Sequence, residues 1–217
     1  MNQDRCLIFP WPNGGNLKNY WEKFQDKRSD RESLQWILGQ FKGLFSALQE
    51  LHESNCRHGD LEPENILWFQ DEHNHGTLQI TDIGLAKLHE KEKSIKARQS
   101  WKSFKTVAPW LIMSRYEPPE MNSTREDPGA RSRQYDMWSM GCVTLELLIW
   151  IVYGYDAVKT FIKSTDYFWT AGPVDAPPSP YRVHPYVVSC MRVMMTQLDD
   201  QSALKDLLGL VEKTPGC

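Results

Sequence analysis

The chain has 217 residues, of which 41% are hydrophobic, 24% are charged and 12% are aromatic. This is the composition of a globular protein with enough apolar side chains for a sizeable core, and it excludes long disorder, collagen-like repeats and low-complexity sequence. The formal net charge of −3 gives no electrostatic reason to expect a nucleic acid or an anionic membrane as a partner. Partners therefore have to be inferred from local sites.

The cysteines are scattered, with no pair at the spacing of metal ligands, and the sequence shows no signal peptide at its start. Such cysteines are typical of free thiols in a reducing compartment. We therefore expect an intracellular protein, cytoplasmic or nuclear. The five cysteines are Cys6, Cys56, Cys142, Cys190 and Cys217.

The first predicted elements are a short strand and a long helix. Residues 6–9 form an apolar run that a Pro- and Gly-rich turn closes, which predicts a strand. Between residues 31 and 53, apolar side chains recur at spacings of three and four, which predicts an amphipathic helix. Ser29 and Glu32 have the spacing of a capping box at its start.

A hairpin and a basic connection follow the long helix. Residues 66–69 and 78–81 read as two short strands joined by a polar turn. In residues 85–115, lysines and arginines far outnumber acidic side chains, and neither a strand nor a helix period is sustained. We expect a long basic segment between ordered parts.

A nearly continuous apolar stretch, residues 137–155, has the length of a membrane span. It contains Glu146 and follows Asp136, so a buried core helix over residues 136–152 is the better interpretation. The remaining predicted elements are a helix near 156–163, a Pro-rich connector at 171–180, and helices at 185–195 and 202–213.

Side chains that could perform chemistry flank the predicted hairpin. Asp60 and Asn65 share one loop before its first strand, and Asp82 follows its second strand. Two carboxylates and an amide oxygen suit Mg²⁺, which takes few protein oxygens together with phosphate. A carboxylate that does not hold the metal can orient a hydroxyl for attack, so this set fits phosphoryl transfer.

Four short motifs raise this interpretation to a family resemblance. In chain order, they resemble the catalytic loop His-Arg-Asp-Leu-Lys-x-x-Asn, the Asp-Phe-Gly motif, the Ala-Pro-Glu close of the activation segment, and the Asp-x-Trp-Ser-x-Gly start of a central helix. The matching residues are His58 to Asn65, Asp82 to Gly84, Arg115 to Glu120 and Asp136 to Gly141. The chain thus resembles the C-terminal lobe of the eukaryotic protein kinases, in particular fungal kinase-like proteins.

The resemblance implies an α+β fold, mainly α, in which a short β-hairpin lies at the catalytic loop and the N-terminal lobe is largely absent. The resemblance also implies that residues 1–217 form a partial kinase domain, which consists of the hinge strand and the C-terminal lobe. Residues 82–120 would be its activation segment. The Gly-rich loop, the phosphate-binding Lys and the Glu that pairs with it are not found in the sequence.

The resemblance also implies roles for individual residues. Asp60 would be the catalytic base, with Asn65 beside it, and Asn65 and Asp82 would bind Mg²⁺. Asp136 would hold the catalytic loop in place. Phe9 would occupy the gatekeeper position, followed by the hinge to adenine. The residues implied to contact ATP are Phe9, Pro10, Trp11, Pro12, Leu67 and Asp82.

Three departures from the kinase pattern lower the expected activity. Pro12 has no backbone N–H to donate to adenine. Gly59 replaces the catalytic-loop Arg that receives a phosphorylated activation segment. Glu62 replaces the catalytic-loop Lys and puts a negative charge where the phosphate is transferred. We therefore expect little turnover from this chain.

Two alternatives remain beside an ATP-dependent kinase that phosphorylates protein Ser or Thr, the subgroup that Pro63 favours. One is a kinase-like interaction module without catalysis. The other, less favoured, is a small-molecule kinase of the aminoglycoside or choline type, whose loop is similar but which lacks a long activation segment and the Asp-x-Trp-Ser-x-Gly helix. The sequence identifies neither the protein substrate nor the oligomeric state.

Overall fold

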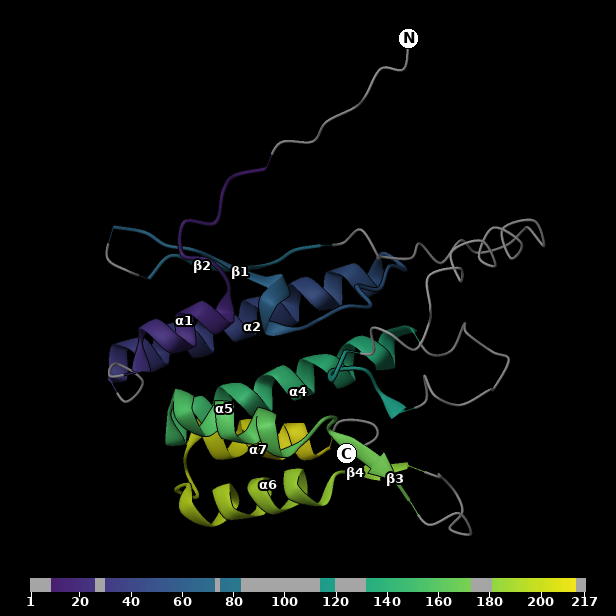
Figure 1. Cartoon of the computed structure of the whole chain (residues 1–217). Helices are drawn as coiled ribbons and strands as arrows, with labels where there is room; N and C mark the ends of the chain where they lie inside the picture. The colour runs from purple at the N-terminus through teal and green to yellow at the C-terminus, as the bar shows by residue number, and fades with distance from the viewer. Residues whose placement is uncertain are drawn as a thin grey trace, which may run out of the picture.

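The computed structural model describes residues 9–25, 30–72, 75–82, 114–119, 132–172 and 181–213. The fold is mostly helical with two small antiparallel sheets (Figure 1), in agreement with the predicted α+β, mainly α, class. Its elements are α1 (Leu17–Lys23), α2 (Arg31–Glu53), the 3₁₀ turn η2 (Pro63–Asn65), β1 (Ile66–Phe69), β2 (Thr77–Ile80), α4 (Ser132–Tyr153), α5 (Tyr155–Ser164), β3 (Trp169–Ala171), β4 (Tyr181–Val183), α6 (Pro185–Gln197) and α7 (Ala203–Glu212).

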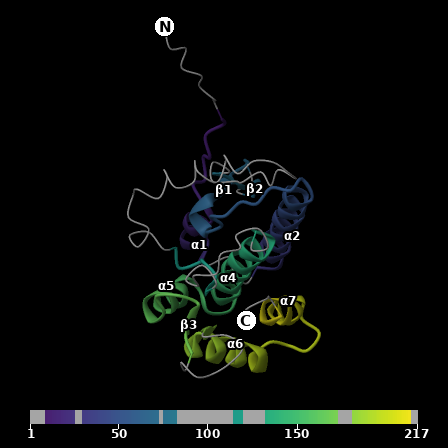
Figure 2. The same ribbon diagram turned by 90° about the vertical axis from the view of Figure 1, so that its right-hand side faces the viewer.

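Helix α4 is the centre of the fold. It lies between α1, α2 and the β1–β2 hairpin on one side and α5, α6 and α7 on the other (Figures 1 and 2). Every residue from Met140 to Ile151 is buried. The helix is long and apolar enough to cross a membrane, but 89% of its most apolar window is buried inside the protein, as predicted for a core helix.

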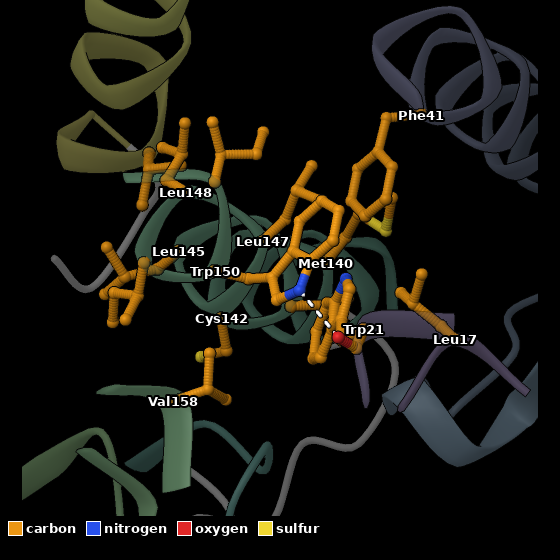
Figure 3. Packing of buried hydrophobic residues seen from close by; sticks show 14 of the residues in the cluster. Leu17, Trp21, Phe41, Met140, Cys142, Leu145, Leu147, Leu148, Trp150 and Val158 are labelled. Carbon is orange, nitrogen blue, oxygen red and sulfur yellow. Dashed lines mark hydrogen bonds between the residues drawn. The ribbon is translucent and has the colours of Figure 1, made fainter. Parts of the chain in front are cut away.

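Large apolar side chains attach the neighbouring helices to α4 (Figure 3). The Trp150 indole N–H donates a hydrogen bond of 2.8 Å to the Trp21 carbonyl, which connects α4 to α1. Phe41 of α2 and Val158 of α5 belong to the same buried cluster. Helices α6 and α7 contribute Val187, Met191, Leu208 and Val211, so the C-terminal part packs on the same core.

Helix α2 has the predicted bounds but a different cap. Asp30 precedes the first helical residue, and its carboxylate accepts the Ser33 N–H at 3.1 Å. The predicted capping box of Ser29 and Glu32 is therefore wrong by one residue. The helix begins at Arg31, which puts Asp30 at the N-cap position, where a short acidic side chain can reach the first free amides.

The two strands of the predicted hairpin form, with β2 one residue earlier than expected. They pair antiparallel with Ile66 opposite Ile80 and Phe69 opposite Thr77. The hairpin lies on α2, where the Trp36 indole N–H donates to the Gly76 carbonyl at 3.0 Å. Residues 6–8 of the strand predicted at 6–9, and residues 85–113 of the basic segment predicted at 85–115, lie outside the described residues. Phe9 is described and is not part of a strand.

Candidate active site

The loop between α2 and β1 is held by a buried carboxylate from α4. Asp136 is completely buried, and its two oxygens accept the backbone N–H groups of His58 and Gly59, both at 2.8 Å. The His52 Nε2 atom, in the last turn of α2, lies 2.8 Å from the same carboxylate. Three polar groups thus converge on Asp136, which fixes the loop as the sequence predicted.

Gly59 replaces the Arg of the kinase pattern, and its backbone explains why a glycine fits. Its φ is +81°, in the left-handed region that an arginine would adopt only with strain. This conformation directs the Gly59 N–H to Asp136. The glycine therefore permits this backbone conformation, and it also removes the positive charge of the arginine.

His58 connects the loop to the end of β2. Its Nδ1 atom accepts the Asp60 N–H at 3.2 Å, so Nε2 carries the proton and donates to the Thr81 carbonyl at 2.6 Å. The ring is completely buried. Thr81, which directly precedes Asp82, is thereby hydrogen-bonded to His58, two residues before Asp60.

Asp60 and Asn65 contact each other beside this connection, and Asp82 directly follows Thr81, which is bound to both His58 and Asn65. The Asn65 side-chain amide donates to the Asp60 carbonyl at 2.9 Å and to its carboxylate at 3.1 Å. The Thr81 N–H donates to the Asn65 carbonyl at 2.9 Å, so the residue directly before Asp82 is hydrogen-bonded to Asn65. Asp82 has a φ of +63°, an uncommon backbone conformation for a residue other than glycine.

The oxygen donors of this set fit Mg²⁺. Because the Asn65 amide nitrogen faces Asp60, its amide oxygen and the Asp82 carboxylate are the atoms suited to a hard cation. Within the described residues, no group of three or more His, Cys, Asp or Glu side chains could hold a metal by itself. Phosphate oxygens would have to complete the coordination, which is the arrangement Mg²⁺ commonly takes.

The residues predicted to contact adenine are only partly assembled. Leu67 is half-buried on β1, and a β-bridge joins it to Asn16. Phe9 and Trp11 are 77% and 87% exposed, and the described residues before α1, from residue 9 on, lie away from the helices in Figure 1. Leu67 therefore lies beside the loop, on the strand that follows it. The exposed Phe9, Pro10 and Trp11 are not brought to the loop.

The chain just after the predicted hinge does reach the sheet. The Gly14 N–H donates to the Trp68 carbonyl at 3.1 Å, and the Trp68 N–H donates to the Gly15 carbonyl at 2.8 Å. A Cβ on Gly14 would lie 2.3 Å from the Trp68 ring, so only glycine permits this approach. The Pro12 carbonyl accepts the Gly15 N–H at 3.2 Å.

Glu62 is half-buried in the loop between α2 and β1, and the Ser114 hydroxyl donates to its carboxylate at 3.2 Å. Burial, followed by the nearby charge of Asp60, raises the pKa of Glu62 above its usual value. No cation within 4 Å pairs with Glu62 among the described residues. The kinase pattern has a lysine at this position, which would attract the Asp60 carboxylate, whereas the Glu62 carboxylate repels it.

Residues 114–119 form a second segment that lies beside the loop. The Ser139 hydroxyl donates to the Tyr116 carbonyl at 2.8 Å, and the Trp169 indole N–H donates to the Glu117 carbonyl at 2.9 Å. The Tyr135 hydroxyl donates to the Glu117 carboxylate at 3.3 Å, and burial raises the pKa of Glu117. Sequence reasoning did not single out these contacts, because they join positions far apart in the chain.

The sequence matches the protein kinase domain family over residues 1–171. This chain belongs to that family. It is 28% identical over 155 residues to the serine/threonine-protein kinase nekl-2 of Caenorhabditis elegans and 29% identical over 147 residues to a Dictyostelium discoideum protein named "Probable myosin light chain kinase". It is 35% identical over 105 residues to human 3-phosphoinositide-dependent protein kinase 1.

These alignments cover only part of the kinases that match. The first two include 68% of this chain but only 37% of the nematode protein and 26% of the Dictyostelium protein. The human alignment includes 48% of this chain and 16% of the relative. The part of the chain that matches the family, residues 1–171, contains the loop, the hairpin and helix α4.

Proposed function

We propose that this kinase domain transfers phosphate from ATP to Ser or Thr hydroxyls of a protein, with Asp60 as the general base. The observation that carries the proposal is the side-chain amide of Asn65, which holds the Asp60 carboxylate in one orientation within a loop that Asp136 fixes. A base held in this way can accept a proton from a substrate hydroxyl without first being ordered. The nematode relative that is named a serine/threonine kinase supports the acceptor class.

Each residue of the set has a separate task in this proposal. One Asp60 oxygen accepts the Asn65 amide, which leaves the other to accept the substrate hydroxyl. His58 fixes the spacing between Asp60 and the end of β2. Mg²⁺, which Asn65 and Asp82 would hold, neutralises phosphate charge when it is bound with ATP.

The test is phosphate transfer from labelled ATP to a mixed protein substrate, comparing wild type with Asp60→Asn. We expect the variant to lose a factor of about 10²–10⁴, which is the usual contribution of a general base. The matched control is Asp206→Asn, which changes an exposed carboxylate on α7 in the same way. This variant should keep wild-type transfer. Equal transfer by Asp60→Asn and wild type would remove Asp60 from this role.

Glu62 favours a second candidate, a kinase-like binding module without catalysis. A carboxyl with no paired cation beside Asp60 opposes the approach of a phosphate to the base. This candidate predicts that millimolar Mg·ATP leaves the thermal unfolding midpoint unchanged, because a ligand that binds only the folded state must raise it. A clear increase of the midpoint would reject this candidate and support the first.

A further inference from the structure

The small sheet of β3 and β4 contains an aromatic residue to which the proposed reaction gives no role. Trp169 is the first residue of β3 and pairs with Val183 of β4. Its ring stacks on that of Tyr167, with 5.3 Å between the ring centres, and meets the Tyr181 ring at 5.0 Å in a T-shaped arrangement. Two aromatic neighbours and the strand pairing therefore fix the orientation of the Trp169 ring.

The polar edge of this ring contacts a segment 52 residues earlier in the chain. The Trp169 indole N–H, which can only donate, forms a hydrogen bond of 2.9 Å to the Glu117 carbonyl. Phe168, directly before Trp169, packs against Tyr116 with 5.8 Å between the ring centres. Two consecutive residues at the start of β3 thus contact two consecutive residues of segment 114–119.

Glu117 is the residue of this segment whose main chain is bound by the β3–β4 sheet. The main chain of its neighbour Tyr116 is bound by α4 instead, because the Ser139 hydroxyl donates to the Tyr116 carbonyl at 2.8 Å. The Glu117 carboxylate accepts the Tyr135 hydroxyl at 3.3 Å, which is long for a hydrogen bond between two oxygens. Of the two hydrogen bonds from Trp169 and Tyr135 to Glu117, that of Trp169 is therefore the shorter and the one that fixes the backbone.

Segment 114–119 lies beside the proposed general base. At one end of the segment, the Ser114 hydroxyl donates to Glu62, two residues after Asp60. Glu117 is also within reach of the Asp60 charge. Burial raises the pKa of Glu117, and the charge of Asp60 raises it further. A displacement of the Glu117 backbone would therefore change the surroundings of Asp60.

The contacts of this segment do not extend to the proposed Mg²⁺ ligands. Within the part of the chain that the structure describes, segment 114–119 forms no hydrogen bond or ion pair with Asn65 or Asp82. In the proposed transfer, Asn65 and Asp82 would hold Mg²⁺ with the phosphate, whereas the acceptor hydroxyl would approach Asp60. The segment therefore borders the part of the site in which the acceptor would bind.

We propose that Trp169 is a positioning residue for the acceptor protein, because its indole N–H holds the Glu117 backbone beside Asp60. The assignment rests on the proposed phosphoryl transfer and adds to it the segment along which the acceptor binds. Trp169 acts through Glu117 and not on the reacting atoms. Its removal should therefore weaken acceptor binding and leave the chemical step unchanged.

Two matched substitutions test this role. Trp169→Phe removes the indole N–H and keeps an aromatic ring. Trp36→Phe is the control, because the Trp36 indole N–H also donates to a backbone carbonyl, that of Gly76, at 3.0 Å. Both tryptophans are half-buried, so the general cost of replacing an indole by a phenyl ring should be similar in the two variants.

Hydrogen exchange of the full chain measures the positioning without any activity. The Glu117 N–H donates to the Ser114 carbonyl at 3.0 Å, and this turn should open more often once the Glu117 carbonyl has lost its donor. The Glu117 amide should lose protection by a factor of about 2–10 in Trp169→Phe and keep wild-type protection in Trp36→Phe. Equal protection in wild type and Trp169→Phe, or the same loss in both variants, would overturn the proposal.

Phosphate transfer from labelled ATP to a mixed protein substrate measures the acceptor role. In Trp169→Phe, the apparent KM for the protein acceptor should rise by a factor of about 2–10, while kcat and the KM for ATP keep their wild-type values. A merely structural role would reduce the folded fraction, which lowers kcat and leaves both KM values unchanged. That pattern, or a rise in the KM for ATP, would overturn the proposal.

The same measurements separate this proposal from the transfer on which it rests. Normal transfer by Trp169→Phe with an unchanged acceptor KM would overturn the acceptor role alone. Absence of transfer in the wild type would overturn the acceptor role together with the proposed function.

A measurement on the wild-type protein covers the case in which Trp169→Phe does not fold. By NMR, the indole N–H of Trp169 should exchange with solvent more slowly than that of Trp11, which is 87% exposed. Equally fast exchange of the two indoles would show that the hydrogen bond to Glu117 is not maintained and would overturn the proposal.

Discussion

Asp136 and Glu146 are two carboxyl groups on the same helix, and both are completely buried. Asp136 accepts two backbone N–H groups and contacts His52, so its charge is distributed over three polar neighbours. Glu146 accepts one tyrosine hydroxyl and lies 3.4 Å from an arginine that has other partners. The difference is in the partners, because the burial is the same.

This contrast shows that one helix can contact two neighbouring segments in different ways, through backbone amides at Asp136 and through side chains at Glu146. The loop between α2 and β1 is bound through backbone amides, which cannot move away from Asp136 without moving the loop. Segment 114–119 reaches Glu146 through the long side chains of Arg115 and Tyr116. A loop fixed by main-chain hydrogen bonds suits a catalytic base, because its orientation does not depend on flexible side chains.

The largest effect should come from removing the better-satisfied carboxylate. Asp136→Ala leaves the His58 and Gly59 amides without their acceptor and should lower the free energy of unfolding by about 3–5 kcal/mol. Urea unfolding followed by tryptophan fluorescence measures this. Asp206→Ala on the surface of α7 is the control, and a similar small loss in both variants would mean that Asp136 does not hold the loop.

A smaller, pH-dependent effect should distinguish Glu146. Its pKa of about 7 in the folded protein exceeds the ordinary 4.5, so its contribution to stability is fully present below pH 4.5 and is lost as pH rises through 7. The difference in unfolding free energy between wild type and Glu146→Gln should therefore change by roughly 2–3 kcal/mol in favour of the variant from pH 4.5 to 8. Urea unfolding at both pH values measures it, and a constant difference would show that burial does not govern this group.

The smallest effect should come from a partly exposed ion pair. Lys18 Nζ lies 2.8 Å from a Glu64 carboxylate oxygen, with the two side chains 44% and 40% exposed. Because water and salt screen such a pair, Lys18→Met should cost less than about 1 kcal/mol, and the cost should decrease further at high salt. A loss as large as that of Asp136→Ala would contradict the distinction between buried and exposed charges made here.

The parts of the fold that the sequence predicted are those with a strong local signal. The spacing of apolar residues located α2, a nearly continuous apolar run located α4, and two short strand candidates around a polar turn located the hairpin. Helix α1 was missed because it has seven residues, too few for a periodic pattern. Asn16, which caps α1 directly after a Gly-rich turn, is the signal that could have found it. Strands β3 and β4, with three residues each, carry no comparable signal.

The same division applies to the candidate site. Asp60, Asn65 and Asp82 lie in short motifs next to one hairpin, so the contact between Asp60 and Asn65 and the position of Asp82 at the end of β2 follow from local structure. The partners of Glu146 depend on how a segment 30 residues earlier in the chain packs against α4, which no local pattern predicts. A glutamate inside an otherwise apolar helix was visible in the sequence, but only packing identifies Tyr116 and Arg115 as its neighbours.

Phosphate transfer by Glu62→Lys, compared with the double variant Glu62→Lys/Asp60→Asn, is the most direct test of whether the loop fixed by Asp136 is a phosphoryl-transfer site. Replacing the carboxyl that lies beside Asp60 with a cation should raise transfer from labelled Mg·ATP by roughly 10²–10³ over wild type. The second substitution should abolish that gain. Equal transfer by wild type and both variants, or full activity in the double variant, would contradict the assignment of Asp60 as the base.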